Sequence, residues 1–290
     1  EDRNIRAVPA GHVRAALWQA AVHGQSASTI WVWDRTFDPR SDFSGSILER
    51  PLCAEAVGLV NCDLNRAARE MTALQQAKPD VLLLHCTSSL VWEGARHTDC
   101  RGKLYEALAF AGLKTGFLTE RQLEAGHVPD ASVIFVPDAV HLSDAARATL
   151  RKFRRHLVLV GGSDVLSRDE YDGKCEPIAS ADRLPWQYGK TKSRELAHAL
   201  GPRLVGWGER PRIELRTESG EPVWGICCRS VATAEGLIVN LCNEGKNPTT
   251  FRMLRDGKGV AARDVLLGTE VGATLTLQPL QPRLLRLDKK

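Results

Sequence analysis

The sequence predicts an α/β protein in which a parallel sheet wrapped by helices is followed by a small antiparallel β-sandwich. Continuous apolar runs at 81–85, 133–136 and 157–160 alternate with helical stretches, which is typical of parallel strands buried on both faces. From about residue 206 the runs become short and alternating, with Gly, Asn and Pro between them. That second pattern indicates antiparallel strands.

Length and composition limit the class of protein. At roughly 150 residues per domain, the 290 residues predict two domains or three small ones. No run approaches the ~20 apolar residues of a membrane span, which excludes a transmembrane protein. The 39 basic and 35 acidic residues are well mixed, whereas a nucleic-acid-binding protein would cluster its basic residues. We expect no nucleic-acid or membrane partner.

The eight cysteines are too sparse for a disulfide scaffold, and there is no CxxC motif. They stand at 53, 62, 86, 100, 175, 227, 228 and 242. Their scatter through apolar runs predicts reduced, buried thiols and a cytoplasmic protein. Because the first residue is Glu1 and no signal peptide precedes it, we expect a fragment or a processed piece of a longer chain.

The N-terminal region reads as helix, strand and helix. Residues 12–23 place their apolar side chains on one face, and Gly24 is a natural stop. Residues 28–33 are rich in β-branched and aromatic side chains and predict a buried strand. A long helical stretch covers about 51–77 and ends before Pro79.

The remaining elements follow from the same periodicities. In the middle region we predict strands at 81–85, 115–118, 133–136 and 157–160. The helices predicted between and after them cover 103–111, 120–125, about 144–155 with Ser143 as N-cap, and 193–200 before Gly201-Pro202. Antiparallel strands are predicted at 212–217, 223–229, 236–241, 249–254, 271–277 and 283–287.

Three segments of the first 50 residues carry a resemblance to a known family. They are Trp18–Gly24 (WQAAVHG), Ile30–Arg35 (IWVWDR) and Phe43–Leu48 (FSGSIL). They resemble the last helix–strand–helix of the (β/α)₈ barrel in β-galactosidases of glycoside hydrolase family 42. The middle region is similar to that family's trimerisation domain, which has a glutamine-amidotransferase-like, flavodoxin-like fold. The tail is similar to its C-terminal β domain.

The resemblance implies three domains and a catalytic role for the larger protein. Residues 1–72 would be the end of the barrel, 73–205 the trimerisation domain, and 206–290 the β-sandwich. Family members are retaining glycosidases with an acid/base and a nucleophile, which stand roughly 5–5.5 Å apart in such enzymes. Glu1 is either the expected nucleophile itself or lies a few residues beyond it, and the acid/base lies outside the sequence. The implied partners are a β-linked sugar, the remainder of the barrel and a homotrimer, without a cofactor or a metal.

The sugar-binding candidates lie at the end of the predicted barrel strand, where barrel enzymes hold their sites. Trp33 could stack on a sugar ring and Arg35 could bind hydroxyls or the nucleophile, with Asp34 and Asp42 beside them. Alternatively, Trp33 fills the barrel and Arg35 forms a structural ion pair. In the loop before Ser44-Gly45, where family members usually carry a Glu and a His that contact galactose, this sequence has Arg40 and Phe43. Another sugar therefore fits as well.

Other motifs have simpler interpretations. His85, Cys86, His97 and Cys100 resemble a set of zinc ligands, but adjacent His-Cys is a poor pair and we expect no zinc. Cys86 follows a strand as an amidotransferase nucleophile does, yet it lacks the glycine-flanked elbow. Gly161-Gly162-Ser163 could cradle an anion, and the basic residues of 147–156 could bind a phosphate or an acidic partner. For these two motifs we expect a plain strand-ending turn and a solvated helix face instead.

Three functions therefore stand beside one another. The first is a part of a retaining β-glycosidase of carbohydrate metabolism. The second is a non-catalytic assembly or carbohydrate-binding module. The third is an amidotransferase-like enzyme in the middle domain, for which the sequence lacks the nucleophile elbow.

Overall fold

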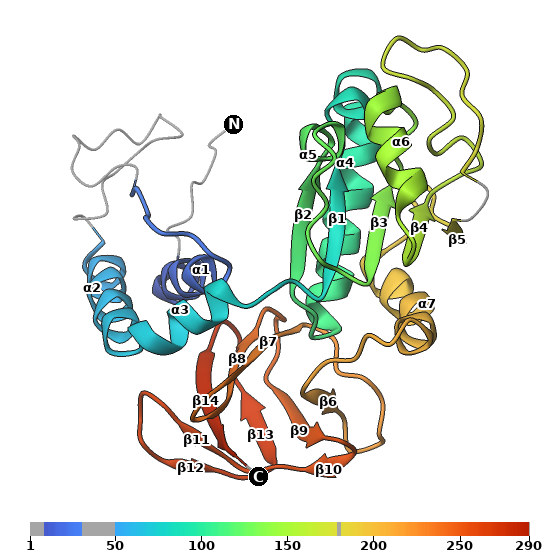
Figure 1. Ribbon diagram of the computed structural model, residues 1–290. Helices are drawn as coiled ribbons and strands as arrows, with labels where there is room; N and C mark the ends of the chain where they lie inside the picture. The colour runs from blue at the N-terminus through green and yellow to red at the C-terminus, as the bar shows by residue number, and fades with distance from the viewer. Residues whose placement is uncertain (1–8, 31–49, 179–180, 290) are drawn as a thin grey trace. The chain divides into compact units, whose positions relative to one another are not determined.

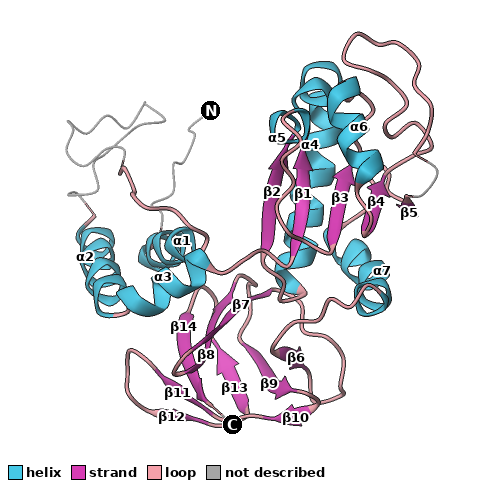
Figure 2. Ribbon diagram, in the orientation of Figure 1, coloured by secondary structure: helices cyan, strands magenta, loops and turns pink. Residues whose placement is uncertain are grey.

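The computed structural model describes residues 9–30, 50–178 and 181–289. The chain divides into two compact units, which are residues 78–212 and residues 1–77 together with 213–290. We call the first the parallel-sheet unit and the second the helix–sandwich unit. Figure 1 follows the chain by colour, and Figure 2 marks its helices and strands. Within the described ranges, no helix is long and apolar enough to cross a membrane.

A parallel sheet organises residues 78–212. Its strands are β1 (Val81–His85), β2 (Thr115–Thr119), β3 (Val133–Pro137), β4 (His156–Val160) and β5 (Asp182–Leu184). They lie in the order β2-β1-β3-β4-β5, and every neighbouring pair is parallel. This is the flavodoxin-like strand order. The predicted parallel sheet is therefore confirmed, and the short edge strand β5 is an addition.

Helices cover both faces of this sheet (Figure 2). They are α4 (Thr87–Phe110), α5 (Glu120–Glu124), α6 (Asp144–Lys152) and α7 (Ser193–Gly206). Because side chains alternate along a strand, Leu82 and Leu84 of β1 pack with α5 and α6, whereas Val81 and Leu83 pack with α4 and α7. This double burial explains why the strands are continuous apolar runs.

Two helices of this unit are longer than predicted. Helix α4 begins at Thr87, far before the expected start at residue 103, and is kinked at Glu93. Helix α7 continues through Pro202 to Gly206, so the expected end before Gly201 was wrong. Leu196, Leu200 and Leu204 of α7 are all buried, and their burial outweighs the backbone hydrogen bond that a proline removes.

The helix–sandwich unit joins the first helices to the C-terminal strands. Its helices are α1 (Ala10–Val22), α2 (Pro51–Arg66) and α3 (Ala68–Gln76). The expected helix over 51–77 is thus two helices that meet at Ala67. Residues 28–30 of the predicted barrel strand carry no regular secondary structure, and the rest of that strand lies outside the described residues.

Two antiparallel sheets form the sandwich. One contains β10-β9-β13 with β6 beside β9, and the other has the order β12-β11-β14-β8-β7. Their bounds are β6 (Glu214–Arg216), β7 (Ile226–Thr233), β8 (Gly236–Asn243), β9 (Thr249–Arg255), β10 (Lys258–Gly259), β11 (Ala262–Asp264), β12 (Glu270–Val271), β13 (Thr274–Leu277) and β14 (Pro282–Asp288). The predicted antiparallel sandwich is confirmed.

Two apolar cores hold this unit together. Residues such as Val239, Phe251 and Leu285 fill the space between the two sheets. Trp18 of α1 and Met71 of α3 pack with strand residues of β8 and β14 to form the second core. Gly236 permits the pairing of β8 with β14, since its φ is 146° and a Cβ there would lie 2.1 Å from the Leu287 carbonyl oxygen.

All eight cysteines are free thiols, and six of them are buried. Cys62 is exposed and Cys175 is half-buried. The expectation of buried thiols therefore holds for most of the set and fails for these two.

Candidate functional site

The sugar-site residues predicted from the sequence lie outside the described residues. Glu1 belongs to 1–8, and Trp33, Asp34, Arg35 and Asp42 belong to 31–49. Their arrangement therefore stays a prediction. The described part of the chain offers a different place for chemistry, in the parallel-sheet unit.

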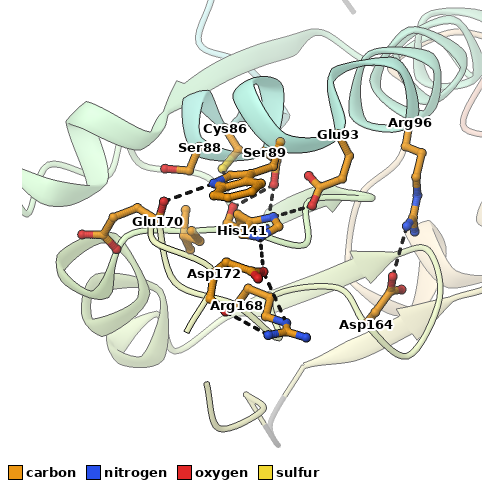
Figure 3. Close-up of polar contacts among 12 residues, drawn as sticks. Cys86, Ser88, Ser89, Glu93, Arg96, His141, Asp164, Arg168, Glu170 and Asp172 are labelled. Atoms are coloured by element: carbon orange, nitrogen blue, oxygen red, sulfur yellow. Dashed lines mark hydrogen bonds and ion pairs between the residues drawn. The ribbon is translucent and has the colours of Figure 1, made fainter. Parts of the chain in front are cut away.

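That place is the carboxyl edge of the parallel sheet, between β1 and β3. Strand β1 has β2 on one side and β3 on the other. The connection that follows β1 therefore leads to one side of the sheet, and the connection that follows β3 leads to the other. Open parallel sheets bind their ligands at such a switch point. Cys86 follows β1, Asp138 follows β3, and His141 lies in the same loop as Asp138. Figure 3 shows the polar side chains gathered here.

Glu120 occupies the position that an anion would take at this edge. Its carboxylate accepts hydrogen bonds from the Ser88 backbone N–H at 2.8 Å, the Ser88 hydroxyl at 2.7 Å and the Ser143 backbone N–H at 2.9 Å. Burial acts to raise the pKa of Glu120, but these donors outweigh it and the pKa lies below its usual range. The N-termini of α4 and α6 are thereby capped by the protein's own carboxylate.

Ser143 is the N-cap residue of α6, as predicted, but its side chain does not cap the helix. Its hydroxyl donates to Glu124 at 2.7 Å, while its backbone N–H donates to Glu120. The Glu120 carboxylate of α5, and not the Ser143 hydroxyl, therefore accepts a backbone hydrogen bond at the start of α6.

Cys86 is placed like a nucleophile but lacks the chemistry of one. Its thiol is buried and donates to the His141 carbonyl oxygen at 3.0 Å, with Glu120 Oε2 at 3.5 Å. Burial, with the Glu120 charge beside it, raises the pKa of Cys86 to about 12. The nucleophilic form of a cysteine is the thiolate, so this thiol is inert near neutral pH.

His97 does not activate that thiol. Its Nδ1 lies 2.5 Å from the Pro137 carbonyl oxygen, which can only accept, so Nδ1 carries the hydrogen. Its Nε2 then accepts from the Cys86 backbone N–H at 3.1 Å. Burial lowers the pKa of His97 to about 4. The ring is therefore a neutral structural bridge between the ends of β1 and β3.

The four suggested zinc ligands have other partners. His85 contacts Arg101, and the Cys100 thiol faces the Val160 carbonyl oxygen at 3.8 Å. Across the described ranges, no three His, Cys, Asp or Glu side chains are arranged to hold a metal ion.

Alkylation rates test the inertness of Cys86. With iodoacetamide at pH 8, we expect Cys86 to react at least about 100-fold more slowly than the exposed Cys62, because little thiolate forms and access is poor. Mass spectrometry of peptides over a time course measures both rates in one sample. Comparable rates in the folded protein would show that Cys86 is activated and would restore the amidotransferase hypothesis.

A histidine between two carboxylates ties helix α4 to the loop after β4 (Figure 3). His141 Nδ1 contacts the Glu93 carboxylate, and Nε2 lies 3.0 Å from Asp172 Oδ1. The ring stacks on Trp92 with centroids 4.9 Å apart and planes at 13°. Burial raises the pKa of Glu93, and the hydrogen bond to His141 lowers the pKa of Asp172. Since both ring nitrogens are engaged, His141 has none free to act as a base.

A pair between the half-buried Arg96 and the buried Asp138 fills the adjoining part of the crevice. Asp138, at φ 38° and 1% exposed, accepts two hydrogen bonds from Arg96 at 2.9 and 3.0 Å. Arg96 also reaches Asp164 at 3.1 Å. Gly161 must lack a side chain, because a Cβ would lie 2.6 Å from Asp138 Oδ1.

The charged groups of the crevice thus contact one another. Sequence reasoning did not identify Glu93, Glu120, Asp138, His141 or Asp172 as a cluster. One signal was available, because Glu120 and Asp138 directly follow strands of a parallel sheet. The arrangement is a self-filled switch point, in which Cys86, His97 and His141 are each held by other groups of the described residues.

Comparison with known proteins defines the class of fold. No protein-family model matches the chain, and no curated protein matches it in sequence. Solved structures do match: the chain has the fold of the C-terminal portion of glycoside hydrolase family 42 enzymes.

Three of these structures show the extent of the likeness. An apo exo-carrageenase of family 42 from Bacteroides ovatus is 21% identical, with a TM-score of 0.78, over 98% of this chain and 39% of that one. A family 42 β-galactosidase from G. stearothermophilus is 11% identical, with a TM-score of 0.71, over 99% and 52%. A β-galactosidase from Bacillus circulans sp. alkalophilus is 12% identical, with a TM-score of 0.70, over 99% and 54%. The chain spans about two fifths to one half of these proteins.

Proposed function

We propose that the chain is the C-terminal portion of a retaining β-glycosidase that hydrolyses O-glycosidic bonds, with its main catalytic carboxylates mostly outside these residues. One observation carries the proposal. Both compact units are matched together, over 98–99% of the chain, by family 42 enzymes. A chance likeness of one common α/β fold would not extend to the helices and the sandwich that accompany it.

The residues proposed for the sugar site come from the sequence. Glu1 is proposed as the nucleophile, and Trp33, Asp34, Arg35 and Asp42 as contacts of the sugar. Trp33 would supply an apolar face and Arg35 a guanidinium for hydroxyls or for the nucleophile carboxylate. The substrate is a β-linked sugar. Because Arg40 replaces a usual galactose contact, both neutral and acidic galactosides belong among the candidates.

The parallel-sheet unit is proposed to serve assembly rather than catalysis. Its switch point is filled by its own side chains, and the described Cys86, His97 and His141 are each engaged by other groups. It also exposes large apolar side chains, with Val91 at 79%, Trp92 at 52% and Tyr171 at 85%. Such side chains are typical of surfaces that meet a partner. We propose a homotrimer in which this unit contributes to the subunit contact.

The alternative is a non-catalytic assembly or carbohydrate-binding module. The self-filled switch point favours it equally, because a module would need no catalytic group. The two hypotheses differ in the polypeptide that accompanies these residues. A glycosidase requires a complete barrel, either in the same chain or tightly bound to it, whereas a module does not.

Hydrolysis of a substrate panel tests the proposed function. The longest native polypeptide that contains these residues is expected to hydrolyse an aryl β-glycoside or an oligosaccharide of carrageenan. Residues 1–290 alone are expected to be inactive. Glu1→Gln should lower kcat by at least about 10³-fold, since the nucleophile is needed at every turnover.

Glu55→Gln is the matched control for that series, because Glu55 is an exposed acid on α2 and should leave kcat unchanged. Light scattering on the same sample measures the oligomeric state, and we expect a trimer. A native polypeptide that forms a trimer but hydrolyses nothing in the panel would favour the assembly module instead.

A further inference from the structure

A groove in the parallel-sheet unit has no role in the function proposed so far. This open groove has a volume of about 430 Å³ and is lined by Asp182, Arg183, Arg203, Gly206 and Trp207. Asp182 and Arg183 open strand β5, and the other three residues end helix α7. Trp207 also lies beside His156, the first residue of β4, at 5.8 Å between ring centroids. The groove therefore lies at the amino edge of the sheet, away from the filled switch point.

Hydrogen bonds hold the side chains of the groove in place. The Trp207 indole N–H donates to Asp182 Oδ2 at 3.2 Å. Arg203 donates to the Arg183 carbonyl oxygen at 2.7 Å, and Arg183 donates to the Gly162 carbonyl oxygen at 3.1 Å. Each guanidinium is thereby anchored through one nitrogen. A ligand would meet side chains that are already positioned, which lowers the entropy cost of binding.

The two arginines carry positive charge that the described residues do not neutralise. Both anchoring hydrogen bonds go to backbone carbonyl oxygens. Within the described ranges, neither guanidinium forms an ion pair with a carboxylate, whereas Arg155 on the same unit pairs with Asp130 at 2.8 Å. Each arginine thus keeps N–H donors for an external oxyanion.

These features specify the chemistry of a ligand. Guanidinium groups bind sulfate, phosphate and carboxylate through paired N–H donors. The partly exposed indole of Trp207 offers an apolar surface to a ring, and the Asp182 carboxylate can accept from a hydroxyl. The volume falls within the roughly 300–1,000 Å³ of small-molecule sites.

We propose that the groove binds an acidic sugar, a pyranose that carries a sulfate ester or a carboxylate. Arg183 and Arg203 hold the anionic group, Trp207 contacts the ring and Asp182 accepts from a hydroxyl. The choice of a sugar over a nucleotide rests on the proposed function, because an indole and two arginines could also hold a base and a phosphate.

Calorimetric titration of the 290-residue chain tests the site. The probes are galactose 4-sulfate, galacturonate, neutral galactose and AMP. We expect the two acidic sugars to bind at least about tenfold more tightly than galactose and AMP. Arg183→Ala and Arg203→Ala should each weaken acidic-sugar binding by about tenfold, as the loss of a charge-assisted hydrogen bond does.

Arg155→Ala is the control for general charge, because it removes a guanidinium from the same unit and should change nothing. The indole N–H signal of Trp207, assigned with Trp207→Phe, should shift in NMR spectra as acidic sugar is added. This signal reports the groove even if an alanine variant folds poorly. Equal binding of AMP, an equal loss in Arg155→Ala, or no binding would each overturn the proposal. Since the titration involves no hydrolysis, its failure is separate from a failure of the proposed function.

Discussion

Replacing Arg96 with alanine is expected to lower the free energy of unfolding of the parallel-sheet unit by about 3–5 kcal/mol at pH 7. Asp138 is 1% exposed, and Arg96 donates to both of its carboxylate oxygens. Without the guanidinium, that carboxylate remains buried with its charge uncompensated. Removing one member of a buried ion pair is far more costly than removing a surface pair.

The loss of unfolding free energy in Arg96→Ala should depend on pH in a defined direction. Burial raises the pKa of Asp138 in the folded protein, and Arg96 opposes that rise. A carboxyl group with a raised folded pKa stabilises the native state below its unfolded pKa of about 3.9 and loses that contribution as the pH rises through the folded value. Arg96→Ala removes the opposing charge and raises the folded pKa further. The deficit of the variant should therefore be smallest near pH 4 and grow toward pH 7.

Hydrogen exchange of the β3 amides measures this unit by itself. The control is Arg155→Ala, whose ion pair with Asp130 joins side chains that are 53% and 67% exposed and should contribute less than about 1 kcal/mol. If Arg96→Ala exchanges like the control at pH 7, or if its deficit does not change with pH, the buried pair does not stabilise the unit as described.

Trp18→Ala should destabilise the helix–sandwich unit by a similar amount, about 3–5 kcal/mol. Trp18 is fully buried beside Met71 of α3 and Ile238 of β8. Its indole N–H donates to the buried Asn240 side chain at 2.7 Å. Alanine would leave a cavity and an unsatisfied amide oxygen, and these two costs add.

Two further variants separate those costs. Trp18→Phe keeps much of the apolar volume but loses the donor, so it should cost about 1–3 kcal/mol. Leu59→Ala removes an apolar side chain that is 53% exposed on α2 and should change stability by less than about 0.5 kcal/mol. Exchange rates of the β8 amides, at residues 236–243, are the measurement. Unchanged protection of β8 in Trp18→Ala would mean that α1 does not stabilise the sheet.

The parallel sheet could be predicted from sequence because its strands are buried on both faces. Val81–His85, Val133–Pro137 and His156–Val160 are nearly unbroken apolar runs, a pattern that few other structures produce. Most sandwich strands were located from their short apolar runs and glycine-rich turns, but the short strands β10 and β11 were missed, and the expected strand at 271–277 is the two strands β12 and β13. The resemblance of the first 50 residues pointed to the same family as the structural comparison.

Long-range packing explains the elements that were misjudged. The first half of α4 is polar and contains Gly94, so local propensity argues against a helix. Its buried face includes His97, Cys100 and Leu104 at helical spacing, and two of these residues were interpreted as zinc-ligand candidates instead. In α7, Gly201-Pro202 reads as a stop, but the leucines on either side of it are buried.

The self-filled switch point could not be foreseen for a different reason. Its members come from four separate segments, and only the fold brings Glu93, His141 and Asp172 together. The kink at Glu93 and the positive φ of Asp172 orient these two carboxylates toward His141. Neither backbone conformation follows from residue type. Glu1, Trp33 and Arg35 remain predictions from sequence.

The most direct test of the central claim is the anomeric configuration of the sugar that the native polypeptide releases first from its β-glycoside substrate. Proton NMR during the first turnovers distinguishes the two anomers before they equilibrate in solution. A retaining glycosidase forms a covalent glycosyl-enzyme and then hydrolyses it with net retention. We therefore predict that the β-anomer appears first and the α-anomer only later, by mutarotation. Initial release of the α-anomer, or no release from any β-glycoside of the panel, would contradict the assignment to a retaining β-glycosidase.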